Sequence, residues 1–288
     1  MALGIVLQTH PAFFLAFITL LGLIVGSFLN VVIHRLPVML ERAWRRECRD
    51  FLELEGNAEE QPPYNLVTPQ SRCPACGHRI RAWENIPLVS YMIQRGRCAA
   101  CKTAIPVRYP LVEALTGVLS LLVAWRFGCG WETAGALLLT WALIALAVID
   151  LRTQLLPDAM TLPFVWLGLL MNVAGLFTDL QSAVLGAVFG YLSLWLVYQA
   201  FKLLTGREGM GHGDFKLLAL LGAWMGWQML PLIILLSSVT GAVIGIALIL
   251  MKGRDKNIPI PFGPYLAIAG WIALLWGDVI IDLYVGTF

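Results

Sequence analysis

Charged residues are scarce in this sequence. Asp, Glu, Lys and Arg together make up 13% of its 288 residues, whereas 59% of the residues are hydrophobic. A soluble domain usually carries about a quarter charged residues. The shortage excludes an ordinary soluble globular protein and indicates an integral membrane protein, in which lipid covers most of the apolar side chains. The mean hydropathy of +0.76 agrees with this interpretation.

Three further patterns are missing. No basic residue precedes the first apolar run, so we expect that run to remain in the membrane rather than to be cleaved as a signal peptide. No βαβ pattern surrounds the glycine-rich stretch GMGHG at 209–213, which disfavours a nucleotide-binding loop. No internal repeat of the kind found in many transporters is visible. Function is therefore expected to depend on the few polar residues within and between the apolar runs.

Eight apolar runs approach or reach the roughly 17–25 residues that are needed to cross a bilayer. The sixth run is short, and only Gln228 and Met229 separate it from the seventh, so these two runs form either separate spans or one bent or re-entrant element. The predicted fold is an all-α polytopic membrane protein with about eight transmembrane helices. The runs are Ala12–Ile33, Leu111–Phe127, Trp131–Asp150, Met160–Phe177, Ala183–Leu204, Phe215–Trp227, Leu230–Met251 and Pro264–Ile281.

Basic residues are concentrated between the first two apolar runs. Residues 34–109 hold 12 of the 20 Lys and Arg residues. If this segment is cytoplasmic, alternating spans place 19 of the 20 on the cytoplasmic side and only Arg126 outside, which satisfies the positive-inside rule. Both termini are then expected to be periplasmic. The expected domains are a first transmembrane helix (1–33), a cytoplasmic domain (34–109) and a seven-helix membrane core (110–288).

Two Cys-x₂-Cys pairs lie in the cytoplasmic segment, separated by 21 residues. Each pair closes a tight turn, and two such turns complete a tetrahedral site for Zn²⁺. Disulfides are disfavoured because the cytoplasm is reducing. Four thiolates leave no open position on the metal, so a zinc ion here is expected to be structural. The four ligands are Cys73, Cys76, Cys98 and Cys101.

The remaining features of this segment carry less information. Residues 41–60 have charges at helical spacing and predict a short amphipathic helix at the membrane surface, either bound to anionic headgroups or simply solvated. Cys48 and Cys129 have no partner at metal spacing, and both are interpreted as ordinary thiols.

Two aspartates stand at the ends of apolar runs on the same, cytoplasmic, face. Asp150 closes the third run, which crosses inward, and Asp214 opens the sixth, which crosses outward. Acids at this depth usually face a bundle interior or a wet cavity and mark function. Two carboxyls that meet cannot both ionise comfortably, and such a pair can activate water against a peptide carbonyl. The helix ends favour an ionised Asp214 and a protonated Asp150.

Residues near these acids have simpler expected roles. Gly209, Gly211 and Gly213 are expected to allow unusual backbone dihedrals and the close approach of a substrate strand. His212 is expected to be solvated. Asp158, which follows Pro157, is expected to cap the next helix through its side chain.

Several stretches together resemble the bacterial type IV prepilin peptidases, which are membrane-embedded aspartic proteases of the GxGD kind. The resemblance spans almost the whole chain, and it implies that Asp150 and Asp214 are the catalytic pair and that the four cysteines named above bind zinc. The stretches are GSFLNVVIHRLP (26–37), the cysteine pairs, RYPLVE (108–113), DLRTQLLPD (150–158), GMGHGDFK (209–216) and PFGP (261–264).

The resemblance also implies substrates and a second activity. Such enzymes cut the short basic leader from prepilins and type II secretion pseudopilins after a glycine, at the cytoplasmic face of the inner membrane. They then N-methylate the new N-terminal residue with S-adenosylmethionine. The expected partners are therefore these precursors and the lipid bilayer, with no nucleic acid; the residues that hold S-adenosylmethionine are not identified.

Two other functions fit part of the pattern. An ion-coupled transporter also places paired acids in a helical bundle, although here both acids lie at one face rather than at the midplane. A non-catalytic zinc-bearing membrane scaffold accounts for the cysteines but leaves the acids without a role. Cleavage of a pilin precursor that depends on both aspartates separates the three functions.

Overall fold

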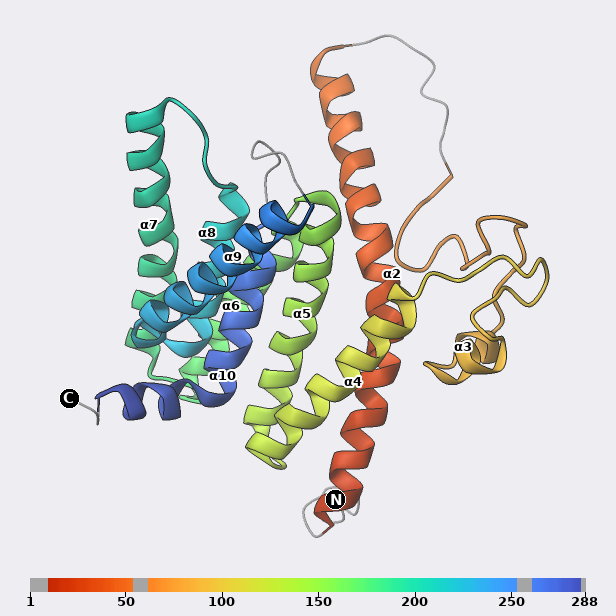
Figure 1. Cartoon of the computed structure of the whole chain (residues 1–288), viewed down its shortest axis with the longest axis horizontal. Coiled ribbons are helices and arrows are strands. Elements are labelled where there is room, and N and C mark those ends of the chain that lie inside the picture. Colours follow the sequence, from red (N-terminus) through yellow and green to blue (C-terminus); the bar gives the residue numbers. More distant parts are fainter. Residues whose placement is uncertain (1–9, 54–61, 253–260, 286–288) are drawn as a thin grey trace. The chain divides into compact units, whose positions relative to one another are not determined.

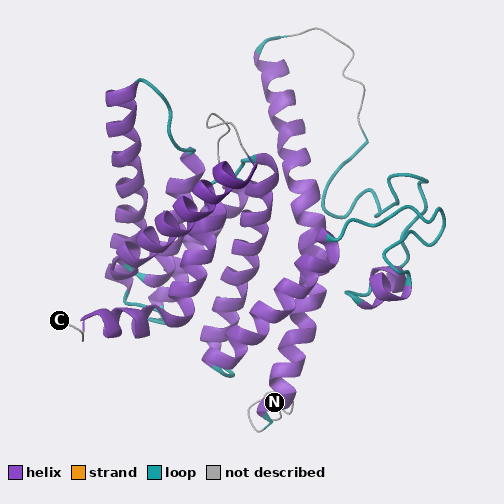
Figure 2. Ribbon diagram, viewed as in Figure 1, coloured by secondary structure: helices purple, strands orange, loops and turns teal. Residues whose placement is uncertain are grey.

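The computed structural model describes residues 10–53, 62–252 and 261–285. Within these ranges the regular elements are helices, with two isolated β-bridges and no strand (Figures 1 and 2). The elements, in chain order, are α2 (Pro11–Phe51), η1 (Ala82–Asn85), α3 (Val89–Ile93), α4 (Arg108–Phe127), α5 (Trp131–Thr153), α6 (Asp158–Val173), α7 (Leu180–Thr205), α8 (His212–Met225), η2 (Trp227–Met229), α9 (Leu230–Lys252) and α10 (Gly263–Val285).

Each of the eight apolar runs forms a helix, which confirms the all-α membrane fold. Six helical stretches in the described residues are long and apolar enough to span a bilayer. The other two, α6 and α8, have only 16 and 14 residues. The sixth and seventh runs form separate helices, because the chain breaks at Gly226, whose φ of +84° is favourable only for glycine. Within the described residues the eight apolar runs therefore correspond to eight separate helices, two of which are shorter than an ordinary span.

Helix α2 is longer than the sequence predicts. The first apolar run and the charged stretch after it form one helix of 41 residues, so the prediction of a separate amphipathic helix at 41–60 is wrong as far as Phe51. Residues 54–61 lie outside the described part of the chain, as do Arg254 and Lys256 of a predicted cytoplasmic loop. Pro37 inside α2 removes a single backbone donor, and the Leu, Glu, Arg and Ala residues after it favour helix, so the helix continues.

The chain divides into two compact units, Met1–Trp125 and Arg126–Phe288. In the N-terminal unit, α2 packs against α4 through small residues. A Cβ on Gly22 would lie 2.5 Å from the Ser120 hydroxyl, and a Cβ on Gly26 would lie 2.8 Å from the Cα of Glu113. Only glycine allows the two backbones to come this close, as is common where helices pack in membranes.

Arg35 joins α2 to the segment that follows it. Its guanidinium is buried and donates hydrogen bonds to the carbonyl oxygens of Asn65 and Pro69, within a stretch that has no regular secondary structure. The Tyr64 ring lies 5.7 Å from this guanidinium and 4.4 Å from that of Arg42, which is about two helical turns further along α2. These contacts hold the stretch that leads to the first cysteine pair against the middle of α2.

Helix α8 is the most enclosed helix of the C-terminal unit. It packs against α6, α7 and α10, and every residue from Leu217 to Met225 is buried. Its contact with α7 is very close: a Cβ on Gly186 or on Gly222 would lie about 2 Å from the carbonyl oxygen of the other residue. The two helices therefore meet backbone to backbone, which fixes the position of α8 and of the residues at its start.

The far end of α8 is held by Asn172. This fully buried side chain donates to the carbonyl oxygens of Ala223 and Trp224, both at 2.9 Å, and accepts from the backbone N–H groups of Phe177 and Thr178. Carbonyl groups in the last turn of a helix have no partner within the helix. One amide side chain thus satisfies the end of α8 and the turn after α6 together.

The close contact of α7 with α8 provides a stability test. Gly222→Leu places a side chain where the α7 backbone lies, so we expect the free energy of unfolding to fall by about 1–3 kcal/mol or more. The measurement is the midpoint of thermal unfolding in detergent. Val184→Leu is the matched control, because Val184 is exposed on α7 and can be enlarged without a clash. An unchanged midpoint for Gly222→Leu would contradict the close contact.

Candidate functional site

Asp150 lies in the last turn of α5, which ends at Thr153. Its side chain is buried, with 5% of its surface exposed. Its Oδ2 atom accepts a hydrogen bond of 3.1 Å from the backbone N–H of Gly263, the first residue of α10. Asp150 is therefore held by the N-terminus of a helix 113 residues further along the chain.

Asp214 is the third residue of α8 and is also buried, with 6% of its surface exposed. It lies close enough to Asp150 for the two carboxyls to interact electrostatically. Leu156 packs against a backbone neighbour of each acid, because Cβ atoms on Gly213 and on Gly263 would lie 2.7 and 3.3 Å from its side chain. The structure thus brings together the two acids that the sequence selects, at one end of the C-terminal unit.

The neighbours of Asp150 change one expectation from the sequence. The negative end of α5 disfavours a charge on Asp150, but the N–H group at the start of α10 is directed at the same carboxyl. Asp214 lies at the start of α8, so each acid faces the positive end of one helix. Helix ends alone therefore no longer predict that Asp150 is protonated and Asp214 ionised.

The glycines before Asp214 differ from one part of the expectation, namely that they adopt unusual backbone dihedrals. Gly209, Gly211 and Gly213 do not have positive φ angles, so unusual dihedrals do not explain them. Instead, a Cβ on Gly209 would lie 2.7 Å from the Phe201 ring, and a Cβ on Gly213 would lie 2.7 Å from Leu156. These two glycines let the loop pack closely against its neighbours, whereas Gly211 has room for a methyl group.

Two side chains near Asp214 also differ from the expectation. Asp158 is the first residue of α6 and does not cap it; both of its oxygens accept hydrogen bonds of 2.7 Å from Lys216 of α8. His212 is exposed, as expected for a solvated residue, but its ring also packs against Tyr198 and Phe215 at centroid distances of 5.1 and 5.5 Å. The ion pair and the ring contacts fix the start of α8 against α6 and α7.

The four cysteines of the N-terminal unit form a second cluster. One sulfur atom from each residue lies within 4.8 Å of the others, and Cys73 and Cys98 are buried while Cys76 and Cys101 are exposed. Cys73 and Cys101, from different pairs, have their sulfur atoms 3.8 Å apart. Four sulfur atoms at such distances could hold a metal ion. Cys48 and Cys129, both exposed, are not part of this cluster.

The two cysteine pairs lie in turns of the same shape. The N–H of Cys73 donates to the carbonyl of His78, and the N–H of Cys98 donates to the carbonyl of Thr103, both at 2.8 Å. The residue four positions after the first cysteine has a positive φ in each turn, namely +72° at Gly77 and +60° at Lys102. The equivalent turns direct their sulfur atoms to one point.

Backbone and hydroxyl groups favour the thiolate form at two of the four cysteines, Cys73 and Cys101. N–H groups of Cys76 and Ala75 lower the pKa of the Cys73 thiol below its ordinary value. The hydroxyl and N–H groups of Thr103 lower the pKa of the Cys101 thiol to about 6. Because the thiolate is the form that binds a metal, these contacts prepare the cluster for a cation.

Glu84 supports the first cysteine turn. Its carboxylate lies 3.1 Å from the Nε2 atom of His78 and accepts a 2.8 Å hydrogen bond from the N–H of Arg81. The Arg81 N–H and the nearby His78 hold the pKa of Glu84 below its ordinary value. The His78 ring is thereby fixed directly after the turn that carries Cys73 and Cys76.

Gly263, in the stretch PFGP, is the residue of the candidate site that the sequence does not predict. A Cβ at this position would lie 2.7 Å from Oδ2 of Asp150, so a residue with a side chain cannot donate the same hydrogen bond without displacing the carboxyl. A glycine in an apolar context 113 residues from its partner carries no local signal of this contact.

Comparisons with known proteins agree with this arrangement. Residues 20–127 match the family model described as the bacterial Peptidase A24 N-terminal domain, and residues 137–246 match the one described as the type IV leader peptidase family. No solved structure matches the chain significantly.

Curated relatives match over nearly the full length. Proteins named prepilin leader peptidase/N-methyltransferase are 60% identical in Pseudomonas aeruginosa and 58% identical in Aeromonas hydrophila, each over 96% of both chains. The relative of the same name in Neisseria gonorrhoeae is 55% identical over 90% of this chain and 89% of its own. Identity and coverage at this level show that the chain belongs to the type IV leader peptidase family.

Proposed function

We propose that this protein is a membrane endopeptidase that removes the basic leader of type IV prepilins and related pseudopilins and then methylates the new N-terminus. The observation that carries the proposal is the meeting of two buried acids, Asp150 and Asp214, at the ends of two membrane helices. Neither a transporter nor a scaffold explains why the pair lies at one end of the helices and beside a glycine loop.

The chemistry follows from two carboxyls that share one proton. The ionised carboxyl takes a proton from water while the water oxygen attacks the carbonyl carbon of the scissile peptide bond. The protonated carboxyl gives its proton to the carbonyl oxygen. Collapse of the resulting tetrahedral intermediate breaks the C–N bond, and the leaving amine takes up a proton from the pair. Throughout, the Gly263 N–H holds one oxygen of Asp150 in place.

The four cysteines are the proposed ligands of a structural Zn²⁺ ion. The donor set fits the metal, since two equivalent turns converge four sulfur atoms within 4.8 Å of one another. When bound, zinc would supply a cross-link between the turns 72–79 and 97–104, in which Cys73 and Cys98 are the buried hydrophobic residues. Cys73, Cys76, Cys98 and Cys101 occupy all four positions, so the metal takes no part in peptide cleavage.

The methyl donor of the proposed second activity is S-adenosylmethionine. Two hollows in the C-terminal unit are lined almost entirely by apolar side chains and do not offer the polar groups that its adenosine and amino-acid ends require. We therefore assign no residues to this cofactor and derive no step through it.

The proposed topology places residues 34–109 and both acids at the cytoplasmic face of the inner membrane, with both termini periplasmic. Its support is the distribution of Lys and Arg over the apolar runs. Labelling of single introduced cysteines with a membrane-impermeant reagent in intact cells and in opened cells tests this orientation.

A cleavage assay tests the whole proposal. The purified protein, in bilayer discs with S-adenosylmethionine, is mixed with a type IV prepilin. Mass spectrometry should show loss of the leader and addition of one methyl group to the new N-terminus. Recovery of only the intact precursor would reject the peptidase, and cleavage without methylation would reject the second activity alone.

The contact of Gly263 with Asp150 makes a separate prediction. Gly263→Ala should lower kcat by about 10- to 100-fold, because the new methyl group displaces the Asp150 carboxyl and a shift of about 1 Å can cost that much. Val184→Leu is the control, because Val184 is exposed on α7 near its start, at the other end of that helix from the loop that leads to Asp214. Equal rates for the two variants would show that the position of Gly263 does not matter.

A further inference from the structure

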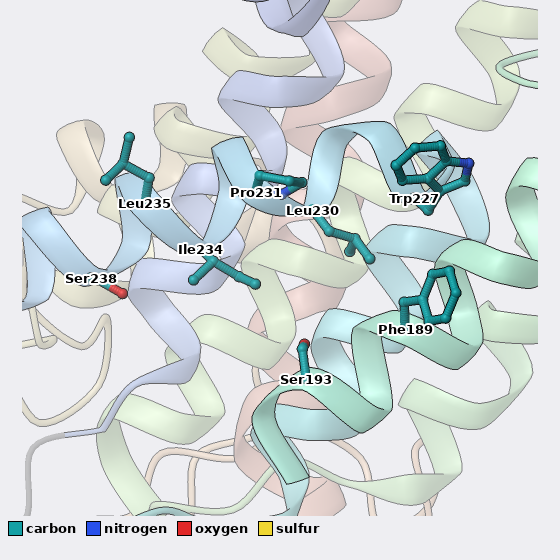
Figure 3. A pocket seen from close by; sticks show the side chains of 8 residues that line it. All are labelled: Phe189, Ser193, Trp227, Leu230, Pro231, Ile234, Leu235 and Ser238. Carbon is teal, nitrogen blue, oxygen red and sulfur yellow. The ribbon is translucent and has the colours of Figure 1, made fainter. Parts of the chain in front are cut away.

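An apolar groove runs along the C-terminal unit between α7 and α9. One part has a volume of about 570 Å³, and Figure 3 shows Phe189 and Ser193 of α7 facing Leu230 and Ile234 of α9 there. A second part, of about 390 Å³, continues from the first, because Ile234 and Ser238 line both. Together the two hollows form one open groove along α9, which we call the α7–α9 groove.

The two helices beside this groove are the least covered of the candidate spans. Of an 18-residue apolar stretch in each helix, only 28% is buried in α7 and 22% in α9, compared with 67% in α5. Helix α7 packs mainly on α8, and α9 packs mainly on α10, so neither closes the space between them. Residues with small side chains, including Ser193, Ser238 and Gly241, line this space and leave room for another helix to come close.

One end of the groove reaches a residue near Asp214 in the sequence and a residue next to the one that contacts Asp150. Its second part is lined by Met210, from the glycine loop that leads into Asp214, and by Phe262, whose neighbour Gly263 holds Asp150. From Leu230 to Ala242 the groove follows about 18 Å of α9, more than half of the roughly 30 Å of a bilayer core. If a peptide bond is held at the acids, the chain that follows it can therefore enter this apolar groove.

We propose that the α7–α9 groove binds, as a helix, the apolar segment of the precursor that follows the scissile bond. This inference rests on the proposed function, because it deepens the description of its substrate. A precursor cut at the membrane boundary has its basic leader in water, so the chain beyond the cut enters the bilayer and needs an apolar surface. A helix satisfies its own backbone groups there, whereas an extended chain does not.

The test compares two substrates and two variants. The first substrate is a synthetic precursor with a Lys- and Arg-rich leader that ends in glycine, followed by about 20 apolar residues. The second is a short peptide that contains the leader and the residue after its glycine but no apolar segment. Ser238→Trp fills the groove, whereas Val239→Trp, at the neighbouring exposed residue of α9 outside both hollows, is the matched control.

Ser238→Trp should raise KM for the full precursor by about tenfold or more, because the apolar segment loses binding that is equal in the ground state and the transition state. The variant should leave cleavage of the short peptide unchanged. Val239→Trp should act on both substrates as the wild type does. Equal loss on both substrates, or no loss on either, would overturn the proposal. If the wild-type protein cleaves neither substrate, that result overturns the proposed function. The proposal for the groove is then decided by the cross-linking measurement below.

A second measurement reports the groove without any cleavage. Ser238→Cys or Val239→Cys is introduced into a chain that carries Cys48→Ser, Cys129→Ser and Asp214→Asn. A short bifunctional thiol reagent should join Cys at position 238, and not at 239, to a single cysteine in the apolar segment of the synthetic precursor. Cross-linking from neither or equally from both positions, or cross-linking to a thiol-bearing lipid that the precursor does not displace, would overturn the assignment.

Discussion

Asp150→Asn and Asp214→Asn are each expected to abolish cleavage of a prepilin, with a loss of about 10⁴-fold or more. Residues that act as one catalytic unit lose nearly all of their effect when one member is removed. Each change keeps the size of the side chain, and in Asp150→Asn the amide oxygen can still accept the Gly263 N–H, so the fold should persist. The measurement is the initial rate of leader removal, with thermal unfolding recorded on the same samples.

The control for this pair is Asp278→Asn. Asp278 is exposed on α10, so the loss of its charge should change neither the rate nor the unfolding midpoint. Appreciable cleavage by either the Asp150 or the Asp214 variant would remove that residue from the catalytic pair. Loss of cleavage together with a much lower unfolding midpoint would mean that the acid supports the fold instead.

Replacing any one of the four clustered cysteines by serine should remove most of the zinc from the N-terminal unit. Binding energy at a structural zinc site is also folding energy, so the stretch 72–104 should lose its protection against hydrogen exchange. The expected results are one zinc per chain in the wild type, far less in each variant, and faster exchange confined to that stretch. Elemental analysis and peptide-resolved hydrogen exchange provide the two readouts.

Cys48→Ser and Cys129→Ser are the controls for the metal site, because both residues are exposed and lie outside the cluster. They should retain full zinc and normal exchange. Equal zinc in Cys73→Ser and the wild type would exclude the cluster as the metal site. Zinc loss in the control variants would show that the protein loses metal through general unfolding.

Much of the fold and the site could be predicted from local sequence patterns. A Cys-x₂-Cys pair is a turn that forms within a few residues, so two of them predict a four-sulfur cluster without knowledge of the rest of the chain. The apolar runs predict the helices because each helix satisfies its own backbone in a membrane. Asp150 and Asp214 could be paired because alternating spans bring their two helix ends to one face.

What sequence reasoning missed depends on contacts between distant residues. Gly263 donates to Asp150 across 113 residues, and Gly213 is required by Leu156 rather than by its own dihedrals. Local patterns contain no information on which backbone will approach which side chain. Likewise, Arg35 anchors the segment containing Asn65 to α2, and no spacing in the sequence indicates that pair.

Helix α8 is short for a helix within a bilayer, and this has a consequence for the access of water to the acids. Its 14 residues extend about 21 Å, against a hydrocarbon thickness of about 30 Å, and α6 beside it has 16 residues. Because α6, α7 and α10 enclose α8, the missing length lies inside the helical bundle and not against lipid. Asp214 stands at the start of α8, so the short helix leaves room for the polar loop before it, and for the water that hydrolysis requires, to reach the acid below the membrane surface.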